Sequence, residues 1–300
     1  MGFQRDEVTL SVPASSANLG PGYDTMGLAL QMRDTVTVRA TTGATHVTVE
    51  GEGAGEVPTD DSNLVVQALR AGLESAGAPQ VGIEMHCCNR IPHGRGLGSS
   101  SAAIVAGLSA AGALLGGEAL TQDDVFQLAV QMEGHPDNAA PTVYGKAVVG
   151  WIETSETGTP RAYARTFEVH PDICVTVLIP HFELATSKAR NLLPDTVPHR
   201  DAAFNVSRAA LLPLALSAYP ELLFYATEDR LHQEYRRVGM PESLKIVDKL
   251  RAAGVPAAIS GAGPSVIVFH HLDPASRQDF ERLGWHPEEL SVATEGVIIS

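Results

Sequence analysis

The chain contains one stretch that decides its fold, Pro92-His93-Gly94-Arg95-Gly96-Leu97-Gly98-Ser99-Ser100-Ser101-Ala102. A strand-like run from Val81 to Asn89 precedes it, and a run rich in Ala, Leu and Val from about Ser100 to Leu115 predicts a helix behind it. Glycines allow positive φ angles and let a ligand approach the backbone closely. A helix start offers unpaired N–H groups and the positive end of the helix dipole. The stretch therefore predicts an anion site, with phosphate as the usual anion and the serine hydroxyls as further donors or a metal ligand.

A simpler interpretation of the same residues is a glycine-rich turn that Ser99 caps. Three glycines, three serines and a following helix favour phosphate binding over that alternative. The stretch is not a P-loop, because no G-x-x-x-x-G-K-[ST] run occurs in the chain. It is not the dinucleotide fingerprint either, because Gly94, Gly96 and Gly98 are spaced differently from G-x-G-x-x-G. A nucleotide at this site would have to bind in another way.

Composition limits the class of partner. The chain has 300 residues, enough for one large domain or two moderate ones, and 44% of them are hydrophobic, which is ample for a globular core. The formal net charge of −14 argues against nucleic acid and against an anionic membrane surface. A small anionic ligand then needs local basic groups or a metal ion.

The cysteines and the N-terminus indicate a compartment. The three cysteines are an odd number, two of them (Cys87 and Cys88) are adjacent, and no C-x-x-C pair occurs, so neither a disulfide framework nor a cysteine metal motif is expected. The first residues hold no apolar signal core, and no apolar run approaches the length of a membrane span. We therefore expect a cytoplasmic protein with reduced cysteines.

A second notable stretch is Pro13-Ala14-Ser15-Ser16-Ala17-Asn18-Leu19-Gly20-Pro21-Gly22-Tyr23-Asp24, which follows a predicted strand from Val8 to Val12. It is small, polar and rich in turn formers, and turn chemistry alone favours an ordinary loop. It is long for a loop, however, and long loops in compact domains are often functional. Asn18 and Asp24 are its two groups with hydrogen-bonding reach.

A third stretch gathers groups that bind cations. Thr121 to Asp124 resembles a capping box and opens a predicted helix through about Met132, and Glu133-Gly134-His135-Pro136-Asp137-Asn138 follows. A glutamate at a helix C-terminus lies at the unfavourable end of the dipole, so Glu133 either faces solvent or has a cation as partner. Zinc is disfavoured by a single His without a nearby Cys. Magnesium held by a carboxylate and substrate phosphates fits better.

The second half of the chain predicts more helices and another glycine turn. Helices are expected over Ala202–Tyr219 (kinked or divided at Pro213), Leu222–Arg237 and Pro241–Ala253. Ser260-Gly261-Ala262-Gly263-Pro264-Ser265 lies between two strand-like runs and could be a plain hairpin turn.

Three loops, Pro13–Asp24, Pro92–Ala102 and Ser260–Ser265, together resemble those of the GHMP kinase superfamily (galactose, homoserine, mevalonate and phosphomevalonate kinases). The phosphate loop of that superfamily has the pattern P-x-x-x-G-L-G-S-S-x-A. Four stretches are similar to the homoserine kinases within it: Pro13–Asp24, Glu133–Pro141, Thr186–Arg190 and Asp229–Gln233. The resemblance runs from residue 8 to about residue 270. Its long motifs are specific, whereas the glycine loops are shared by the superfamily.

The resemblance implies a fold and an activity. The fold is a two-domain α+β fold, with an N-terminal domain (1–165) that holds the phosphate loop and a left-handed βαβ unit, and a ferredoxin-like C-terminal domain (166–300). The activity is ATP-dependent phosphorylation of the L-homoserine hydroxyl to O-phospho-L-homoserine, on the route to threonine. A homodimer is what the family suggests.

The resemblance also implies roles for the matched residues. The backbone from Gly94 to Ser101, within the loop Pro92–Ala102, would cradle the triphosphate of ATP, and Ser100 and Glu133 would hold Mg²⁺. Substrate contacts are expected from Asn18, Asp24, His135, Asn138, Thr186, Arg190, Arg236 and Gly261. A zwitterionic amino acid needs an arginine for its carboxylate and an oxygen acceptor for its ammonium group. Arg190 and Arg236 suit the first task, and Asp24 or a carbonyl suits the second.

Some assignments stay open at this point. Asp137 falls where mevalonate-type relatives place a catalytic aspartate, and it either takes the hydroxyl proton or holds its loop in place. The arginines could be surface charges. The alternatives for the whole chain are a GHMP kinase that acts on a sugar or on mevalonate, and a GHMP-fold protein that binds its ligand without turnover. Intact Ser100, Glu133 and phosphate loop argue against the last.

Overall fold

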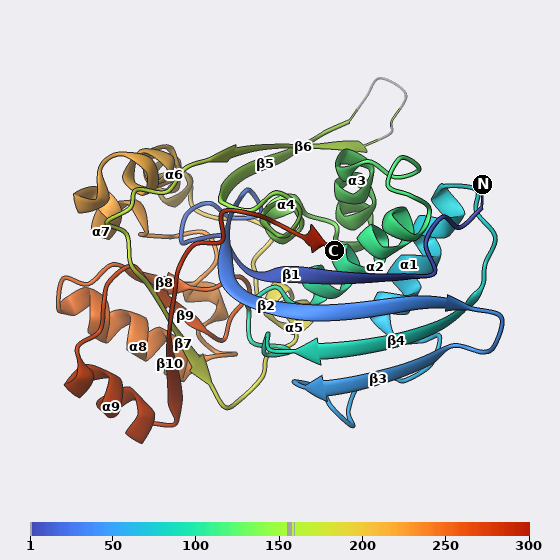
Figure 1. Ribbon diagram of the computed structural model, residues 1–300. Helices are drawn as coiled ribbons and strands as arrows, with labels where there is room; N and C mark the ends of the chain where they lie inside the picture. The colour runs from blue at the N-terminus through green and yellow to red at the C-terminus, as the bar shows by residue number, and fades with distance from the viewer. Residues whose placement is uncertain (1, 155–157, 159) are drawn as a thin grey trace.

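The larger of two sheets is built mainly from the N-terminal half of the chain (Figure 1). The computed structural model describes residues 2–154, 158 and 160–300. The strands of this sheet lie in the order β11-β1-β2-β4-β3, and β5 and β6 continue from one end of β2. Their bounds are β1 Glu7–Ala17, β2 Met26–Thr41, β3 His46–Gly51, β4 Gly82–Asn89, β5 Ala147–Thr154, β6 Pro160–Phe167 and β11 Ile298–Ile299.

Four helices cover one face of this sheet, and the first of them belongs to a βαβ unit. The parallel strands β3 and β4 are joined through α1 (Leu64–Ser75), which packs against α2 (Ser99–Leu114). Helix α2 is buried on nearly all sides because it is built mainly from small and apolar residues, and it lies against β1 and α3 (Gln122–Glu133). Helix α4 (Pro136–Tyr144) follows α3 and contacts both β1 and β2. The core therefore holds the helix behind the phosphate loop rigidly against the sheet.

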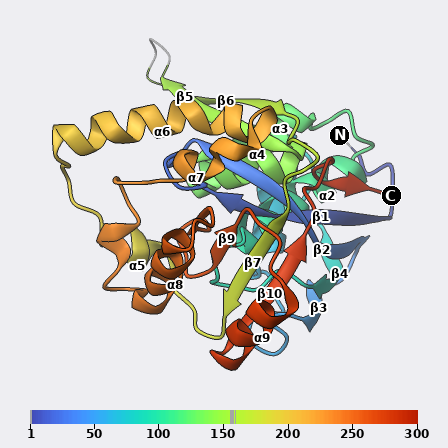
Figure 2. The ribbon, with the colours of Figure 1, turned by 90° about the vertical axis from the view of Figure 1, so that its left-hand side faces the viewer.

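The smaller sheet has the ferredoxin-like order β10-β7-β9-β8. Its strands are β7 Val175–Pro180, β8 Ala257–Ile259, β9 Val266–Val268 and β10 Trp285–Leu290, and every pair is antiparallel. Helices α8 (Pro241–Ala252) and α9 (Pro274–Arg282) lie on one face of it, as Figure 2 shows. Residues of α8, α9, β8, β9 and β10 share a second hydrophobic core.

A helical layer connects the two sheets. It consists of α5 (Thr186–Arg190), α6 (His199–Ser217), α7 (Leu223–Ala226) and the short 3-10 helices η1 (Pro220–Leu222) and η2 (Glu234–Arg236). The division proposed after residue 165 falls inside β6, and the first strand of the smaller sheet begins at Val175. Within the described ranges, no helix combines the length and apolar character that a membrane span needs.

Several sequence-based predictions of elements were wrong. A continuous helix over Leu222–Arg237 does not form, because the Asp229 carboxylate accepts the backbone N–H groups of Leu231, His232 and Gln233 and holds a turn instead. Of the two outcomes expected at Pro213, a kink or a division, the division does not occur, because α6 continues through this residue.

Other elements were missed. Pro13 to Ala17 continues β1 beyond the predicted strand, and α4 and β10 were not predicted. The capping box at Thr121 is confirmed, since its hydroxyl accepts the Asp124 N–H and the Asp124 carboxylate accepts the Thr121 N–H.

Hydrogen bonds to its own backbone groups fix the phosphate loop from both sides. At its start, the buried Asp34 carboxylate accepts the N–H groups of Arg90 and Ile91 at 2.6 and 2.9 Å, although burial raises the pKa of this group. At its centre, the Ser260 hydroxyl donates to the Gly96 carbonyl at 2.6 Å. At its end, the Ser15 N–H donates to the Leu97 carbonyl at 3.0 Å. The loop is thereby tied to both sheets.

The close approach at Gly96 makes a stability prediction. Its φ is +74°, and a Cβ atom there would lie 2.3 Å from the Ser260 carbonyl oxygen. Gly55 has a similar φ of +78°, but a Cβ atom there would meet nothing within 4 Å. We expect Gly55→Ala to lower the free energy of unfolding by about 1–2 kcal/mol through backbone strain alone. Gly96→Ala should cost roughly 1–3 kcal/mol more, because the backbone of residue 260 must move.

Urea unfolding of both variants, followed by circular dichroism, measures the difference. Equal losses for Gly96→Ala and Gly55→Ala would contradict the tight packing of the two loops.

Candidate active site

A cavity of about 390 Å³ opens where the three predicted loops meet. The Gly261 N–H donates to the Ala17 carbonyl at 3.0 Å, and the Asn18 amide donates to the Gly261 carbonyl at 2.8 Å. These bonds join the loop after β1 to the loop between β8 and β9. The cavity lining includes most residues that the sequence singled out: Asn18, Asp24, Gly94, Gly96, Gly98, Ser99, Ser100, Glu133, His135, Asp137, Asn138, Thr186, Arg190, Arg236 and Gly261.

The N-terminus of α2 forms one end of this cavity. Its N-cap is Gly98, with a φ of +71° and no side chain that caps the helix, so the alternative of a turn capped by Ser99 is wrong. A Cβ atom at Gly98 would lie 2.0 Å from the Ser15 hydroxyl oxygen, which explains the need for glycine. The first N–H groups of α2 have no intrahelical partners. Together with the dipole, they make this end of the cavity attractive to anions.

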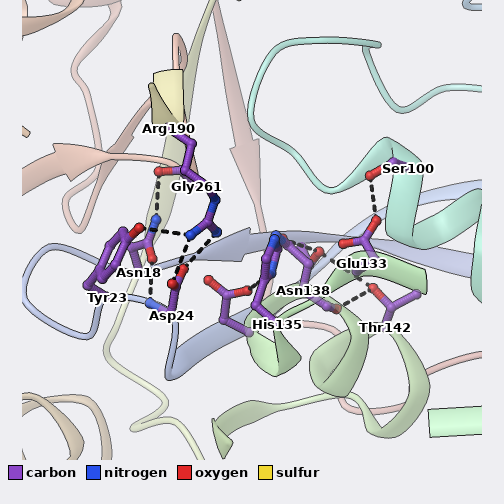
Figure 3. Close-up of polar contacts among 12 residues, drawn as sticks. Asn18, Tyr23, Asp24, Ser100, Glu133, His135, Asn138, Thr142, Arg190 and Gly261 are labelled. Carbon is purple, nitrogen blue, oxygen red and sulfur yellow. Dashed lines mark hydrogen bonds and ion pairs between the residues drawn. The ribbon is translucent and has the colours of Figure 1, made fainter. Parts of the chain in front are cut away.

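Ser100 and Glu133 meet beside this helix start, as Figure 3 shows. The Ser100 hydroxyl donates to the Glu133 Oε1 atom at 2.6 Å. Burial raises the pKa of Glu133, and the bond from Ser100 and the nearby His135 oppose that rise. A hydroxyl and a carboxylate at this distance are two hard oxygen donors that one Mg²⁺ ion can share, and they leave positions for water and phosphate oxygens. The residues present therefore fit a magnesium ion.

His135 and Asp137 form a second pair in the same wall. The His135 Nδ1 and Asp137 Oδ1 atoms are 2.5 Å apart, and Asp137 is only 2% exposed. Burial alone would lower the pKa of His135, but the hydrogen bond and charge of Asp137, with the charge of Glu133, raise it above its usual value. The pair places a protonatable imidazole, oriented by a carboxylate, between Glu133 and the other end of the cavity.

Asp24 and Arg190 form an ion pair at the opposite end (Figure 3). Arg190 donates from Nη1 to Asp24 Oδ2 and from Nη2 to Asp24 Oδ1, each at 2.9 Å, and this bond raises the pKa of Arg190. Arg190 also donates to the Tyr23 hydroxyl at 2.9 Å. Asp24 itself has a positive φ of 54°, and its N–H donates to the Asn18 side-chain oxygen at 3.0 Å. The loop after β1 therefore sets the carboxylate against the arginine.

Arg236 adds a buried positive charge to the same end. It is 2% exposed, donates to His232 Nδ1 at 2.9 Å and makes longer contacts to the carbonyls of Ala189 and Gly261. Within the described chain it makes no ion pair, and burial lowers its pKa. His232 in turn donates from Nε2 to the Gly20 carbonyl at 2.8 Å, which fixes the tautomer that accepts from Arg236. A buried guanidinium without an acid partner is costly unless a ligand supplies the anion.

A second cavity of about 330 Å³ adjoins the first, and Ser99 and Ser100 line both. Its walls are mainly apolar and come from β2, β3, α1 and the preceding loop: Val36, Val49, Val57, Leu64 and Val65. The sequence patterns did not predict this cavity. Asn63, which also lines it, caps α1 by accepting the Val65 N–H at 2.9 Å. The wall is assembled from segments that lie far apart in the chain, and no short motif marks it.

Six residues of the predicted phosphate loop point elsewhere. The Arg95 guanidinium donates to the Pro180 and His181 carbonyls and pairs with Glu183. Leu97 is buried in the core, and the Ser101 hydroxyl is fully buried without a hydrogen-bond partner in the described chain. His93 and Ala102 line the second cavity. Pro92 is buried and lines neither cavity.

Sequence comparisons agree with this geometry. The family model of the GHMP kinases N terminal domain matches residues 63–146, and that of the GHMP kinases C terminal domain matches residues 215–281. Homoserine kinase of Corynebacterium aurimucosum is 51% identical over 296 residues, which cover 96% of this chain and 94% of the relative. Homoserine kinase of Streptomyces avermitilis is 45% identical over 304 residues, which cover 99% and 97%.

A comparison of structures gives the same result. The crystal structure of homoserine kinase from Cytophaga hutchinsonii superposes with a TM-score of 0.83 at 26% identity, covering 99% of this chain and 98% of that one. Three observations lead to the same family: the α+β architecture, the loop between β4 and α2, and the near-complete matches to these relatives. The chain therefore belongs to the homoserine kinase family of the GHMP kinases.

Proposed function

We propose that the protein transfers the γ-phosphate of ATP to the side-chain hydroxyl of L-homoserine and releases O-phospho-L-homoserine, a step in threonine biosynthesis. One observation carries the proposal: two cavities of different character meet at Ser99 and Ser100, at the start of α2. The apolar cavity suits the adenosine moiety, the helix start suits the phosphates, and the cavity with paired charges suits a small zwitterion.

The acceptor end is complementary to an amino acid. Arg236 is buried, makes no ion pair in the described ranges of the chain, and would bind the substrate carboxylate, with Arg190 beside it. Asp24 would accept the ammonium group, so that the zwitterion replaces the direct contact between Asp24 and Arg190 with two contacts of its own. The amide of Asn138, whose oxygen accepts from Ser15, and the hydroxyl of Thr186 line the space between. The side chain of the substrate is then directed at the phosphate end.

Mg²⁺ bound by Ser100 and Glu133 would neutralise charge that develops on the phosphates during transfer. The protein supplies positioning: the N–H groups of α2 hold the phosphates, and the ion-paired end holds the acceptor. His135 lies between these ends, and the hydrogen bond and charge of Asp137 raise its pKa. The N–H groups of α2 provide local positive potential in a chain of net charge −14.

Asp137 is assigned a positioning role. Its carboxylate is almost fully buried and is already engaged by His135 at 2.5 Å. A loose transition state requires little removal of the hydroxyl proton before the phosphoryl group has left ATP. Asp137 therefore orients His135 and does not take the proton. The cytoplasmic location remains a proposal that rests on the cysteines and the N-terminal residues. The homodimer, which the family suggests, and the domain division after residue 165 also remain proposals.

The function is tested by measuring ADP release with Mg-ATP and a panel of alcohols. Homoserine should be the best substrate. Two analogues keep its hydroxyl: 4-hydroxybutyrate lacks the ammonium group, and 3-aminopropan-1-ol lacks the carboxylate. Each should lose about 10- to 100-fold in kcat/KM, the value of one hydrogen bond to a charged group. Mevalonate and galactose should be poorer still. ADP release with mevalonate but not homoserine would contradict the substrate, and none with any alcohol would contradict the enzyme.

Arg236→Lys, with Arg237→Lys as its matched control, tests the acceptor end. Arg237 lies next in the chain but pairs with Glu234 and Asp248 at the surface. Arg236→Lys should raise the KM for homoserine about 10-fold or more and leave that for 3-aminopropan-1-ol unchanged, because the analogue has no carboxylate to lose. Arg237→Lys should change neither value.

The role of Asp137 gives a separate prediction. If Asp137 acts through His135, then Asp137→Asn and His135→Gln should each lower kcat by about 10-fold, and the double variant should lose no more than either one. A general base would behave differently: Asp137→Asn alone would cost about 100-fold or more, and His135→Gln would cost little. Steady-state kcat values of the three variants, with folding checked by circular dichroism, decide between these roles.

A further inference from the structure

Three side chains that can ligate a transition metal meet on the outer face of the larger sheet, away from both cavities. Glu50 lies on the edge strand β3, and His86 and Cys88 lie on its neighbour β4. The parallel register pairs Glu50 with Cys88 and Thr48 with His86. One ligand atom from each of Glu50, His86 and Cys88 lies within 4.8 Å of the other two. Residues 38 positions apart in the chain are thus brought together by strand pairing.

The distances are close to those of a metal polyhedron but do not equal them. His86 Nε2 and Cys88 Sγ are 3.2 Å apart, His86 Nε2 and Glu50 Oε1 are 3.9 Å apart, and Cys88 Sγ and Glu50 Oε2 are 4.0 Å apart. Tetrahedral zinc with ordinary bond lengths requires ligand separations of about 3.3–3.6 Å. The Glu50 side chain is 73% exposed and can rotate to make up the difference.

The orientation of the imidazole is already set. The Thr48 hydroxyl donates to the Met85 carbonyl at 3.2 Å, so its oxygen accepts from His86 Nδ1–H at 2.9 Å. The lone pair of Nε2 then faces Cys88 and Glu50. Metal-binding histidines are usually held by such a hydrogen bond from the nitrogen that does not bind the metal. Thr48 is therefore placed to orient a ligand as well as to extend β3.

We propose that Glu50, His86 and Cys88 form a zinc site, with water as the fourth ligand. A thiolate, an imidazole and a carboxylate suit Zn²⁺ and not Mg²⁺, which prefers oxygen ligands alone. Zinc binds the deprotonated thiolate, so the Cys88 proton is released as the Zn–S bond forms. The ion fastens the edge strand β3 to β4. The opposite face of the same two strands carries Val49 and Cys87, which line the apolar cavity.

The experiment uses the full chain without ATP and with excess Mg²⁺, which occupies oxygen-only sites. Zn²⁺ binding is measured by equilibrium dialysis, and Co²⁺ is added separately because a cobalt–thiolate bond gives a charge-transfer absorption band. The wild type should bind one Zn²⁺ and, in the separate measurement with Co²⁺, show the cobalt–thiolate band. Cys88→Ser and His86→Asn should bind Zn²⁺ at least about 10-fold more weakly, and Cys88→Ser should lose the band. Thr48→Val should keep the band with about 10-fold weaker binding.

Matched controls separate this site from other surface groups. Cys174→Ser removes an exposed free thiol, and His286→Asn removes an exposed histidine paired with Glu288 but not with a cysteine. Both should bind Zn²⁺ like the wild type. Zn²⁺ should also raise the Tm of the wild type and not that of Cys88→Ser, by mass action on the folded state. No cobalt–thiolate band in the wild type, or an unchanged band in Cys88→Ser, would overturn the proposal.

The outcome is independent of the proposed kinase function. The three ligands face away from the cavities, so Cys88→Ser should phosphorylate homoserine with Mg-ATP at the wild-type rate. If the protein binds zinc at this site but does not phosphorylate homoserine, the zinc site stands and the proposed function is wrong. If it phosphorylates homoserine but does not bind zinc there, the proposed function stands and the zinc site is wrong.

Discussion

The contact between three loops is the constraint on which the site depends. The phosphate loop, the end of β1 with the loop that follows it, and the loop between β8 and β9 are held by three hydrogen bonds: the Ser15 N–H to the Leu97 carbonyl, the Ser260 hydroxyl to the Gly96 carbonyl and the Gly261 N–H to the Ala17 carbonyl. Such contacts require glycine at Gly96 and Gly98, because a Cβ atom at either position would overlap an oxygen of a neighbouring segment. Since two of these segments belong to the larger sheet and the third to the smaller one, the cavity exists only when both sheets are folded and docked.

The positive groups of the site lie around this contact, although the chain as a whole is strongly acidic. The net charge of −14 would repel ATP and an acidic product. The site compensates locally with the N-terminus of α2 and with two arginines, one of which is buried and makes no ion pair among the residues that the structure describes. Neutral His232 holds that buried arginine in place from the turn that Asp229 caps. The segment that breaks the predicted helix is thus the one that supports Arg236.

The sequence supported some of these features better than others. Gly98 with the following serines marks a helix start, and the Glu133 cluster is dense in ligand groups, so the phosphate end could be predicted from local chemistry. The resemblance to GHMP kinases supplied Arg190 and Arg236, which local patterns could not separate from surface charges. The apolar cavity and the Glu50–His86–Cys88 cluster could not be predicted, because strand register and long-range packing create them. The helix expected over Leu222–Arg237 does not form because the Asp229 side chain accepts backbone N–H groups that a helix would use. The periodicity of apolar residues does not reveal such a hydrogen bond.

The central claim is that Glu133 and Ser100 form the magnesium end of the phosphate site. The most direct measurement is the Mg²⁺ dependence of homoserine phosphorylation by Glu133→Gln, with Glu74→Gln as a control. Glu74 is also a glutamate at a helix C-terminus but is exposed and lies outside both cavities. Glu133→Gln should lower kcat/KM on the order of 100-fold or more and raise the Mg²⁺ concentration needed for half-maximal rate. Glu74→Gln should match the wild type. A Glu133→Gln variant with the Mg²⁺ dependence and rate of the wild type would contradict the account.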